Sequence, residues 1–224
     1  MRKFLLIISF VLLGVISFAQ INVELKKELD SILFKDQIYR EFVDTETSES
    51  RKDSIAKLTH HSKEELLNNV WGIINTVDKE NLEKVEKIIA QYDYPGKTMV
   101  GEPTNTAVFY VIQHSDKIKE YYPLIEKAAK KKELPMHFAA MMLDRKLLSE
   151  GEPQIYGTQL YGRQITNKET GEKEFFMYVQ PIKNPIKVNK RRKKAGFETT
   201  VEENALKFNV VYKPYTLEEI NKIK

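Results

Sequence analysis

The stretch LPMHFAAMMLDRKLLSEGEPQIYGTQ, residues 134–159, decides the fold of this 224-residue chain. Pro135 suits the first turn of a helix, because its missing N–H would have no partner there. Apolar side chains then cover almost every face of the predicted helix, and such a helix is normally buried. Gly151 fits a C-cap, and Pro153 prevents the helix from continuing. The stretch therefore predicts a buried central helix that ends at Gly151 and turns into an extended segment.

Two charged residues, Asp144 and Arg145, interrupt the apolar composition of this helix. A buried charge is costly unless it is paired or hydrogen-bonded. The segment after the helix offers partners, because hydrogen-bonding side chains crowd around Gly157, where a backbone can approach closely. Those side chains are Gln154, Tyr156, Thr158 and Gln159. Either the two charges only tie the helix to this segment, or the whole set binds a ligand, and both interpretations stay open.

The composition sets the class of protein. With 42% hydrophobic and 30% charged residues, the chain suffices for one globular domain with its own core. The net charge is +4, so overall charge does not argue for a nucleic acid or an anionic membrane as partner. The chain has no cysteine, which excludes disulfides, thiol nucleophiles and cysteine-based metal sites. We expect no metal and no cofactor.

The first 19 residues have the pattern of a signal peptide. A short basic start precedes an apolar run, and small residues stand directly before Gln20. An uncleaved membrane anchor is the alternative, but the run is shorter than the ~20 residues that a spanning helix needs. We therefore expect a signal peptide over residues 1–19 and a single domain over 20–224. The mature protein would be exported, periplasmic or secreted, without a stable membrane span.

Helical patterns occupy most of the chain outside the central helix. A capping box, in which Ser or Thr is followed three residues later by Glu, marks three helix starts. The boxes are Ser62 with Glu65, Thr200 with Glu203, and Thr216 with Glu219. We also expect Asp78 to cap a separate helix, and the acidic, Ser- and Thr-rich residues 44–53 to form a loop.

Beyond the central helix the pattern changes to strands. Residues 160–166 and 174–180 are strand-like, and a polar linker with Gly171 joins them, which predicts a β-hairpin. Several capped helices with one pair of strands indicate an α+β, mainly α domain. We expect the hairpin to pack against the end of the central helix. Residues 183–194 then carry seven basic and no acidic side chains, which we interpret as a solvated face, because no interleaved aromatics indicate nucleic-acid binding.

His114 lies on an apolar stripe with Ala107 and Val111, at helical spacing. Asp144 also points toward packed side chains of its own helix. Inward polar groups on two separate helices are costly unless they meet each other or a common partner. We therefore predict that His114, Asp144 and the segment after the central helix line one site, where both helices meet the hairpin.

Several short strings stand out when they are read together. They are Tyr92-Asp-Tyr-Pro-Gly96, Gln113-His114-Ser-Asp116, Asp144-Arg145, Gly151-x-Pro-Gln-x-Tyr-Gly-Thr-Gln159 and Val188-Asn189-Lys-Arg-Arg192. Together they resemble an uncharacterised bacterial family that is catalogued as a domain of unknown function, over about residues 92–197. Asn189 stands where that family tends to have an acidic residue. The resemblance implies no reaction, but it implies one constellation of polar residues: His114, Asp144, Arg145, Gln154, Tyr156, Gln159 and Arg192.

Three functions fit these residues. In the first, Arg145, Gln154, Tyr156, Gln159 and Arg192 bind a polar ligand, such as a glycan or a cell-envelope fragment. In the second, the protein is a hydrolase in which His114 is the general base and Asp144 orients it; a variant uses Glu150 or Glu152 as the acid of a glycan-cleaving site. In the third, the polar set is only an internal network that specifies the fold.

Overall fold

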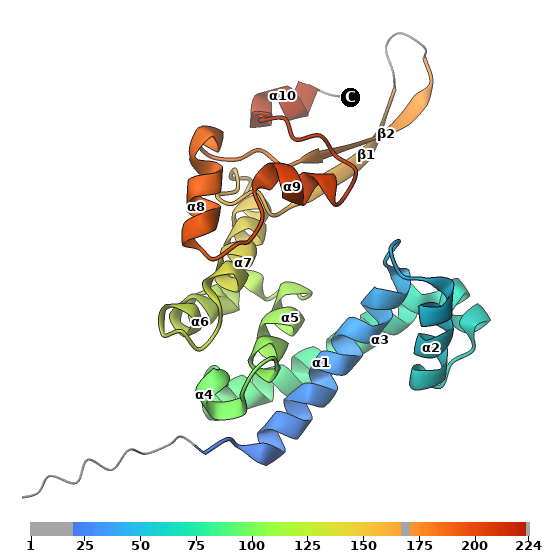
Figure 1. The fold of residues 1–224 in the computed structure, drawn as a ribbon, viewed down its shortest axis with the longest axis vertical. Coiled ribbons are helices and arrows are strands. Elements are labelled where there is room, and N and C mark those ends of the chain that lie inside the picture. Colours follow the sequence, from blue (N-terminus) through green and yellow to red (C-terminus); the bar gives the residue numbers. More distant parts are fainter. Residues whose placement is uncertain (1–19, 167–170, 223–224) are drawn as a thin grey trace, which may run out of the picture.

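The computed structural model describes residues 20–166 and 171–222 (Figure 1). The expected signal peptide, residues 1–19, lies outside the described residues. Within them the chain forms ten α-helices, two short 3-10 helices and one antiparallel pair of strands, which confirms an α+β, mainly α fold. In order, the elements are α1 (Val23–Val43), α2 (Glu49–Thr59), α3 (Lys63–Tyr92), α4 (Lys97–Val100), η1 (Thr104–Thr106), α5 (Ala107–Gln113), α6 (Ile118–Lys130), α7 (Met136–Ser149), β1 (Leu160–Thr166), β2 (Lys173–Val179), η2 (Pro185–Lys187), α8 (Val188–Lys194), α9 (Val201–Leu206) and α10 (Leu217–Lys222).

The long helices α1 and α3 pack side by side, and α2 closes one end of the pair (Figure 1). Leu29 and Ile32 of α1 belong to a large core cluster that α3, α5, α6 and α7 share. Ile38 and Phe42, further along α1, belong to a second cluster with α2 and α3. Asp36 lies between the two clusters and is only 1% exposed. A carboxylate is thus buried in the middle of α1, where a partner is required.

Two predictions about the N-terminal helices are wrong. Asp78 caps no helix, because α3 runs on through it; the backbone leaves helical geometry only at Asn69. The carboxylate of Asp78 instead accepts hydrogen bonds from Arg40. The expected loop over residues 44–53 is also shorter, because Ser48 already caps α2 by accepting the N–H of Arg51.

The central helix α7 is less enclosed than its apolar composition predicts. Its fully buried residues are Ala139, Ala140, Met142 and Asp144, while Met136 is 38% exposed. The helix packs against α5 and α6, and the polar segment that follows it covers another side. The helix ends as expected: Gly151 has φ +78°, a left-handed conformation that glycine adopts readily.

The predicted hairpin is confirmed, with β1 and β2 antiparallel and Leu160 opposite Val179. Its base belongs to a third core cluster with residues of α8 and α9, such as Val188 and Val201. The expected packing of the hairpin against the end of α7 is therefore wrong, because its apolar base covers α8 and α9 instead. What links the hairpin to α7 is the segment of residues 151–159 between them.

No helix among residues 20–166 and 171–222 is long and apolar enough to cross a membrane. The capping boxes predicted at Thr200 and Thr216 are both present, each with Glu three residues later as the reciprocal partner.

Candidate functional site

Asp144 is completely buried and is surrounded by donors from the segment that follows α7. Its Oδ1 accepts the N–H groups of Ile155 (2.7 Å) and Tyr156 (2.9 Å). Its Oδ2 accepts both the N–H (3.0 Å) and the hydroxyl (2.9 Å) of Thr158. Burial raises the pKa of the Asp144 carboxyl above its ordinary value, while these donors favour the ionised form. The carboxylate thus holds residues 155–158, which we call the Asp144 loop.

Gln154 and Gly157 complete this arrangement. Gln154 is 0% exposed; its amide donates to the carbonyls of Gln159 (3.0 Å) and Gln180 (2.7 Å) and accepts the N–H of Gln159 (3.0 Å). Gly157 has φ +68°, and a Cβ there would come within 2.7 Å of Ile182 and Val201. The loop is therefore closed by the same hydrogen bonds and packing that join it to the third core cluster.

Two arginines of α8 bind the carbonyls of the Asp144 loop from the other side. Arg191 donates to the carbonyl of Ile155 (2.8 Å). Arg192, which is 2% exposed, donates to the carbonyl of Tyr156 (2.9 Å) and to that of Thr199 (2.8 Å), and its guanidinium lies over the ring of Phe197. The N–H groups of Ile155, Tyr156 and Thr158 and the carbonyls of Ile155 and Tyr156 thus all have hydrogen-bond partners within the protein. Asp144, Gln154 and Arg192 form a buried network that shapes the loop.

The remaining members of the loop make only local contacts. The amide of Gln159 donates to the hydroxyl of Thr158 (3.0 Å), and the ring of Tyr156 lies 6.0 Å from that of Phe197. Both side chains are partly buried. Neither contacts His114, so the loop does not supply the partners that the sequence led us to expect for that histidine.

The predicted pairing of His114 with Asp144 is wrong. The Nδ1 of His114 instead lies 3.1 Å from Oδ1 of Asp36, the buried carboxylate of α1. Its Nε2 lies 3.3 Å from the amide nitrogen of Gln113, whose Oε1 is buried without a partner. The physical reason is that backbone N–H groups and Thr158 already saturate the carboxylate of Asp144, whereas no backbone N–H donates to the carboxylate of Asp36.

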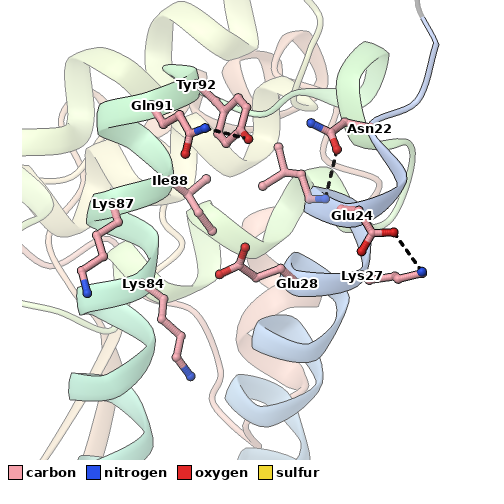
Figure 2. Close-up of a pocket in the computed structure, with 10 residues that line it drawn as sticks. Asn22, Glu24, Lys27, Glu28, Lys84, Lys87, Ile88, Gln91 and Tyr92 are labelled. Atoms are coloured by element: carbon pink, nitrogen blue, oxygen red, sulfur yellow. Dashed lines mark hydrogen bonds and ion pairs between the residues drawn. The ribbon is translucent and has the colours of Figure 1, made fainter.

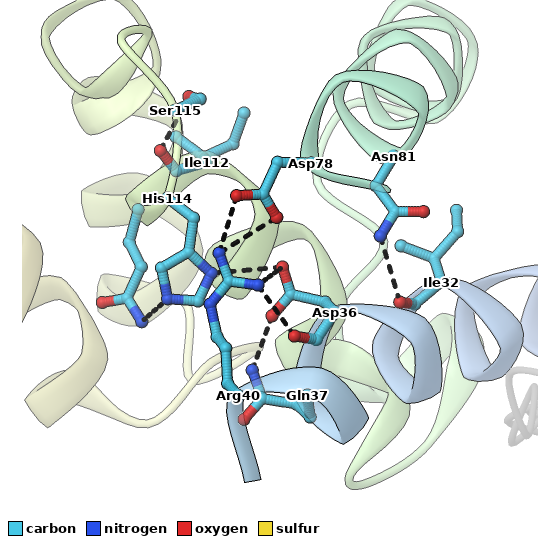
Figure 3. A network of polar contacts seen from close by, with 10 residues as sticks. Ile32, Asp36, Gln37, Arg40, Asp78, Asn81, Ile112, His114 and Ser115 are labelled. Atoms are coloured by element: carbon cyan, nitrogen blue, oxygen red, sulfur yellow. Dashed lines mark hydrogen bonds and ion pairs between the residues drawn. The ribbon is translucent and has the colours of Figure 1, made fainter. Parts of the chain in front are cut away.

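Asp36 and His114 belong to a network of charged side chains from three helices (Figure 3). Arg40, one turn after Asp36, donates to both oxygens of Asp78 on α3 at 3.0 and 2.8 Å. The same guanidinium lies 3.7 Å from Asp36. Gln37 donates to the second oxygen of Asp36 (2.6 Å). Asp36, Arg40, Asp78 and His114 are called the Asp36 network below.

Arg145 lies next to this network but is not bonded within it. Its Nε is buried without a hydrogen-bond partner, and no hydrogen bond or ion pair joins Arg145 to any residue of the described chain. Burial, and then the charge of Arg40, lower the pKa of the Arg145 guanidinium below its ordinary value. The positive charges of Arg40 on α1 and Arg145 on α7 therefore repel each other. Arg40 is neutralised by Asp78 and Asp36, whereas Arg145 forms no ion pair within the described chain.

An aromatic contact fixes α5 against α7 at the same junction. The ring of Tyr110 on α5 lies 6.5 Å from His114 and 5.8 Å from Phe138 of α7. Arg145 follows Phe138 by seven residues and therefore shares its side of the helix. The side of α7 that carries Arg145 consequently faces the helix that ends in His114.

The Asp36 network is reachable from a depression of about 470 Å³ between α3 and the end of α5. His114, Asp78 and Asp116 line it, together with Asn75 and Lys79. A larger depression of about 670 Å³ lies between α1 and α3 (Figure 2). It is lined by exposed side chains of both signs, such as Glu28 and Lys87. The depression beside His114 is the better candidate for a binding site, because it borders the buried Asp36–His114 pair and the larger one does not.

The sequence contained a signal for Asp36 that helical spacing could have found. Five buried residues of α1 follow one another at intervals of three or four residues: Leu25, Leu29, Ile32, Asp36 and Tyr39. A carboxylate on such a stripe indicates a buried partner, just as His114 on its own apolar stripe does. Arg40 and Asp78 gave no comparable signal, because charged residues at exposed helical positions are common.

The chain belongs to a family of unknown function, DUF6624, whose model matches residues 42–213. The match includes His114, Asp144, Arg145 and the Asp144 loop, whereas Asp36 and Arg40 precede it. Comparisons with curated proteins and with solved structures find no match. The family therefore brings no reaction and no ligand with it, and function has to be argued from the site.

Proposed function

We propose that the protein binds a small ligand with a carboxylate or a phosphate group, at the junction of α1, α5 and α7. The observation that carries the proposal is the buried Nε of Arg145, which lacks an acceptor among the described residues. The side chain of Arg145 is partly exposed, but a buried N–H without an acceptor is costly, and a bound anion would remove that cost. The planar fork of arginine matches carboxylates and phosphates in a bidentate manner.

The neighbours of Arg145 suit a ligand that also carries hydroxyl or amide groups. The imidazole of His114 and the amide of Gln113, at the end of the helix that faces this side of α7, offer donors and acceptors. The unpaired Oε1 of Gln113 can accept one further hydrogen bond. Acidic glycans and fragments of the cell envelope have this combination of groups. An exported protein, with its signal peptide cleaved before Gln20, would meet them outside the cytoplasm.

The Asp36–His114 pair favours a second candidate function, hydrolysis with His114 as the general base. A buried carboxylate bonded to one nitrogen of a histidine orients the ring and stabilises its protonated form. Asp36 is 1% exposed, whereas the side chain of His114 is 17% exposed and borders the 470 Å³ depression. In this function Asp36 takes the orienting role that the sequence assigned to Asp144. Replacement by His114→Gln should then abolish turnover of a hydrolysable ligand while leaving its binding measurable.

Thermal denaturation of the chain from Gln20 tests the binding proposal. The chain is titrated with inorganic phosphate, citrate, an acidic sugar and the corresponding neutral sugar. Anions that bind the native state should raise the melting temperature, by an amount that corresponds to ~2.7 kcal/mol when the ligand is at 100 times its Kd. The neutral sugar should have no effect at the same concentration.

Two variants give this test its control. Arg145→Met should abolish the anion-dependent increase in melting temperature. Arg51→Met should retain it, because Arg51 is an exposed arginine of α2 that pairs with Glu41 away from the junction. An increase that survives in Arg145→Met, or the absence of any anion effect in the unmodified chain, would contradict the proposal.

A further inference from the structure

The lysines of the C-terminal region gather on one exposed surface. Residues 183–194 contain five exposed lysines, while Arg191 and Arg192 of the same run turn inward to bind carbonyls. The exposed lysines are Lys183, Lys187, Lys190, Lys193 and Lys194. Within the described part of the chain, none of the five forms an ion pair. The basic run is thus divided between an inner structural side and an outer side without counter-charges.

This surface continues beyond α8. A depression of about 370 Å³ brings Lys194 together with Lys97 of α4 and with Lys132, which follows α6. Leu134, Pro135 and Met136 provide an apolar floor beneath these ammonium groups, and Glu102 is the only acidic residue among those that line it. Helices α8, α6 and α4 lie along the same side of the molecule (Figure 1). We call the five lysines of residues 183–194, with Lys97 and Lys132, the lysine face.

An apolar side chain projects from the middle of the basic run. Ile186, in the short helix η2 between Lys183 and Lys187, is 94% exposed. An isoleucine that is almost fully exposed and flanked by lysines is typical of a segment that inserts between lipid headgroups. Stacking of nucleobases would instead require exposed aromatic rings, and the lysine face contains none.

The N-terminal end of the described chain lies near the same face. The N–H of Asn22 donates to the carbonyl of Met99 in α4 (2.9 Å), two residues from Lys97. The first described residues therefore lie close to Lys97 of the lysine face.

We propose that the lysine face docks on an anionic phospholipid surface, with Ile186 inserted below the headgroups. The small overall charge of +4 does not oppose this, because attraction within a Debye length depends on the local charge of the contacting face. All three core clusters lie within residues 20–222. The chain from Gln20 contains all three of these clusters and allows the face to be tested without the apolar N-terminal run.

Co-sedimentation with lipid vesicles tests the proposal. The chain from Gln20 should bind vesicles that contain equal parts of phosphatidylglycerol and phosphatidylcholine, and it should leave them at high salt. The triple variant Lys187→Gln, Lys190→Gln, Lys194→Gln should bind roughly tenfold or more weakly, because each lysine near an anionic surface contributes to binding. Ile186→Ser should weaken binding several-fold without changing its dependence on salt.

A matched triple variant is available on α1 and α3. Lys27→Gln, Lys84→Gln, Lys87→Gln removes the same charge from the depression shown in Figure 2 and should leave vesicle binding unchanged. The proposal is overturned if this control loses as much binding as the α8 variant, or if vesicles of pure phosphatidylcholine bind equally well. It is also overturned if the chain fails to bind the anionic vesicles, or binds a single-stranded oligonucleotide more tightly than it binds them.

Discussion

Asp144 and Arg145 are neighbours on α7, yet their surroundings are opposite. Asp144 accepts hydrogen bonds from three backbone N–H groups and one hydroxyl, and every donor comes from the Asp144 loop. Arg145, one residue later, has a buried Nε without any acceptor. A saturated polar group contributes to the fold, whereas an unsatisfied one lowers stability and calls for an external partner. The difference assigns a structural role to the Asp144 loop and a binding role to the junction beside Arg145.

The largest effect expected from this comparison is the loss of the Asp144 carboxylate. Asp144→Ala leaves the four donors of the Asp144 loop without their acceptor. It also removes a negative charge near the buried guanidinium of Arg192. The free energy of unfolding, measured with urea, should fall by about 3–5 kcal/mol. Glu150→Ala removes another acidic group near the end of α7, from a solvent-exposed pair with Lys146, and should change stability by no more than ~0.5 kcal/mol. Equal effects of the two changes would contradict the structural role of the loop.

Gly157 tests how tightly the Asp144 loop is packed. Gly157→Ala introduces a Cβ at φ +68° and places it within 2.7 Å of Ile182 and Val201. We expect a loss of about 2–3 kcal/mol from backbone strain and overpacking together. Gly151→Ala also places a Cβ in the left-handed region, at φ +78°, but no atom lies within 4 Å of that Cβ. The free energy of unfolding should therefore fall by only about 1 kcal/mol. If the two variants unfold alike in urea, the packing around Gly157 has been overstated.

Arg145→Met should raise the free energy of unfolding, whereas the preceding changes lower it. Methionine preserves much of the side-chain volume and removes a guanidinium that has no acceptor, so the free energy of unfolding should rise by about 1 kcal/mol. Arg192→Met is the matched change at a satisfied arginine and should lower stability by about 2–3 kcal/mol, because the carbonyls of Tyr156 and Thr199 lose their donor. Urea denaturation of both variants in an anion-free buffer distinguishes them. Destabilisation by Arg145→Met would show that Arg145 is structural as well.

The smallest expected effect is that of His137 on the pH dependence of stability. His137 on α7 lies 4.2 Å from the ring of Phe138 and 5.9 Å from that of Phe197, and burial lowers its pKa below the ordinary value. The unfolded chain therefore binds more protons just below pH ~6.5. The stability from neutral His137 is present above that pH and is lost as the pH falls toward the lowered pKa.

The difference between the unmodified chain and His137→Gln isolates this contribution. Urea denaturation between pH 5 and 8 should show a smaller loss of stability at low pH in the variant. A variant that follows the same pH dependence as the unmodified chain would assign the effect to other groups.

The sequence predicted local features well and long-range contacts poorly. The central helix, its end at Gly151 and the hairpin were visible, because caps, turns and periodicity act over a few residues. The segment after α7 was expected to supply partners for Asp144, and it does so through backbone N–H groups and the hydroxyl of Thr158. The partner of His114 lies 78 residues away in α1, and no local pattern specifies such a pairing. Asp36 nevertheless could have been singled out as a carboxylate on a buried stripe.

The lysine run shows a second limit of the sequence. Seven basic residues in twelve looked like a single solvated face, but the structure turns Arg191 and Arg192 inward to the Asp144 loop. Which members of a basic run become structural depends on carbonyls that the fold brings near, here those of Ile155 and Tyr156. The overall net charge likewise could not predict that lysines are concentrated on one surface, because it says nothing about where the charges lie.

Side-chain NMR of the arginine Nε–Hε groups tests the central comparison most directly. A titration with inorganic phosphate is followed on uniformly ¹⁵N-labelled chain from Gln20, with the Arg145 and Arg192 signals assigned by their absence from Arg145→Met and Arg192→Met. We expect the Arg145 signal to shift in a saturable manner, because its Nε–H gains an acceptor, and the Arg192 signal to stay in place. A fixed Arg145 signal, or equal shifts of both arginines, would contradict it.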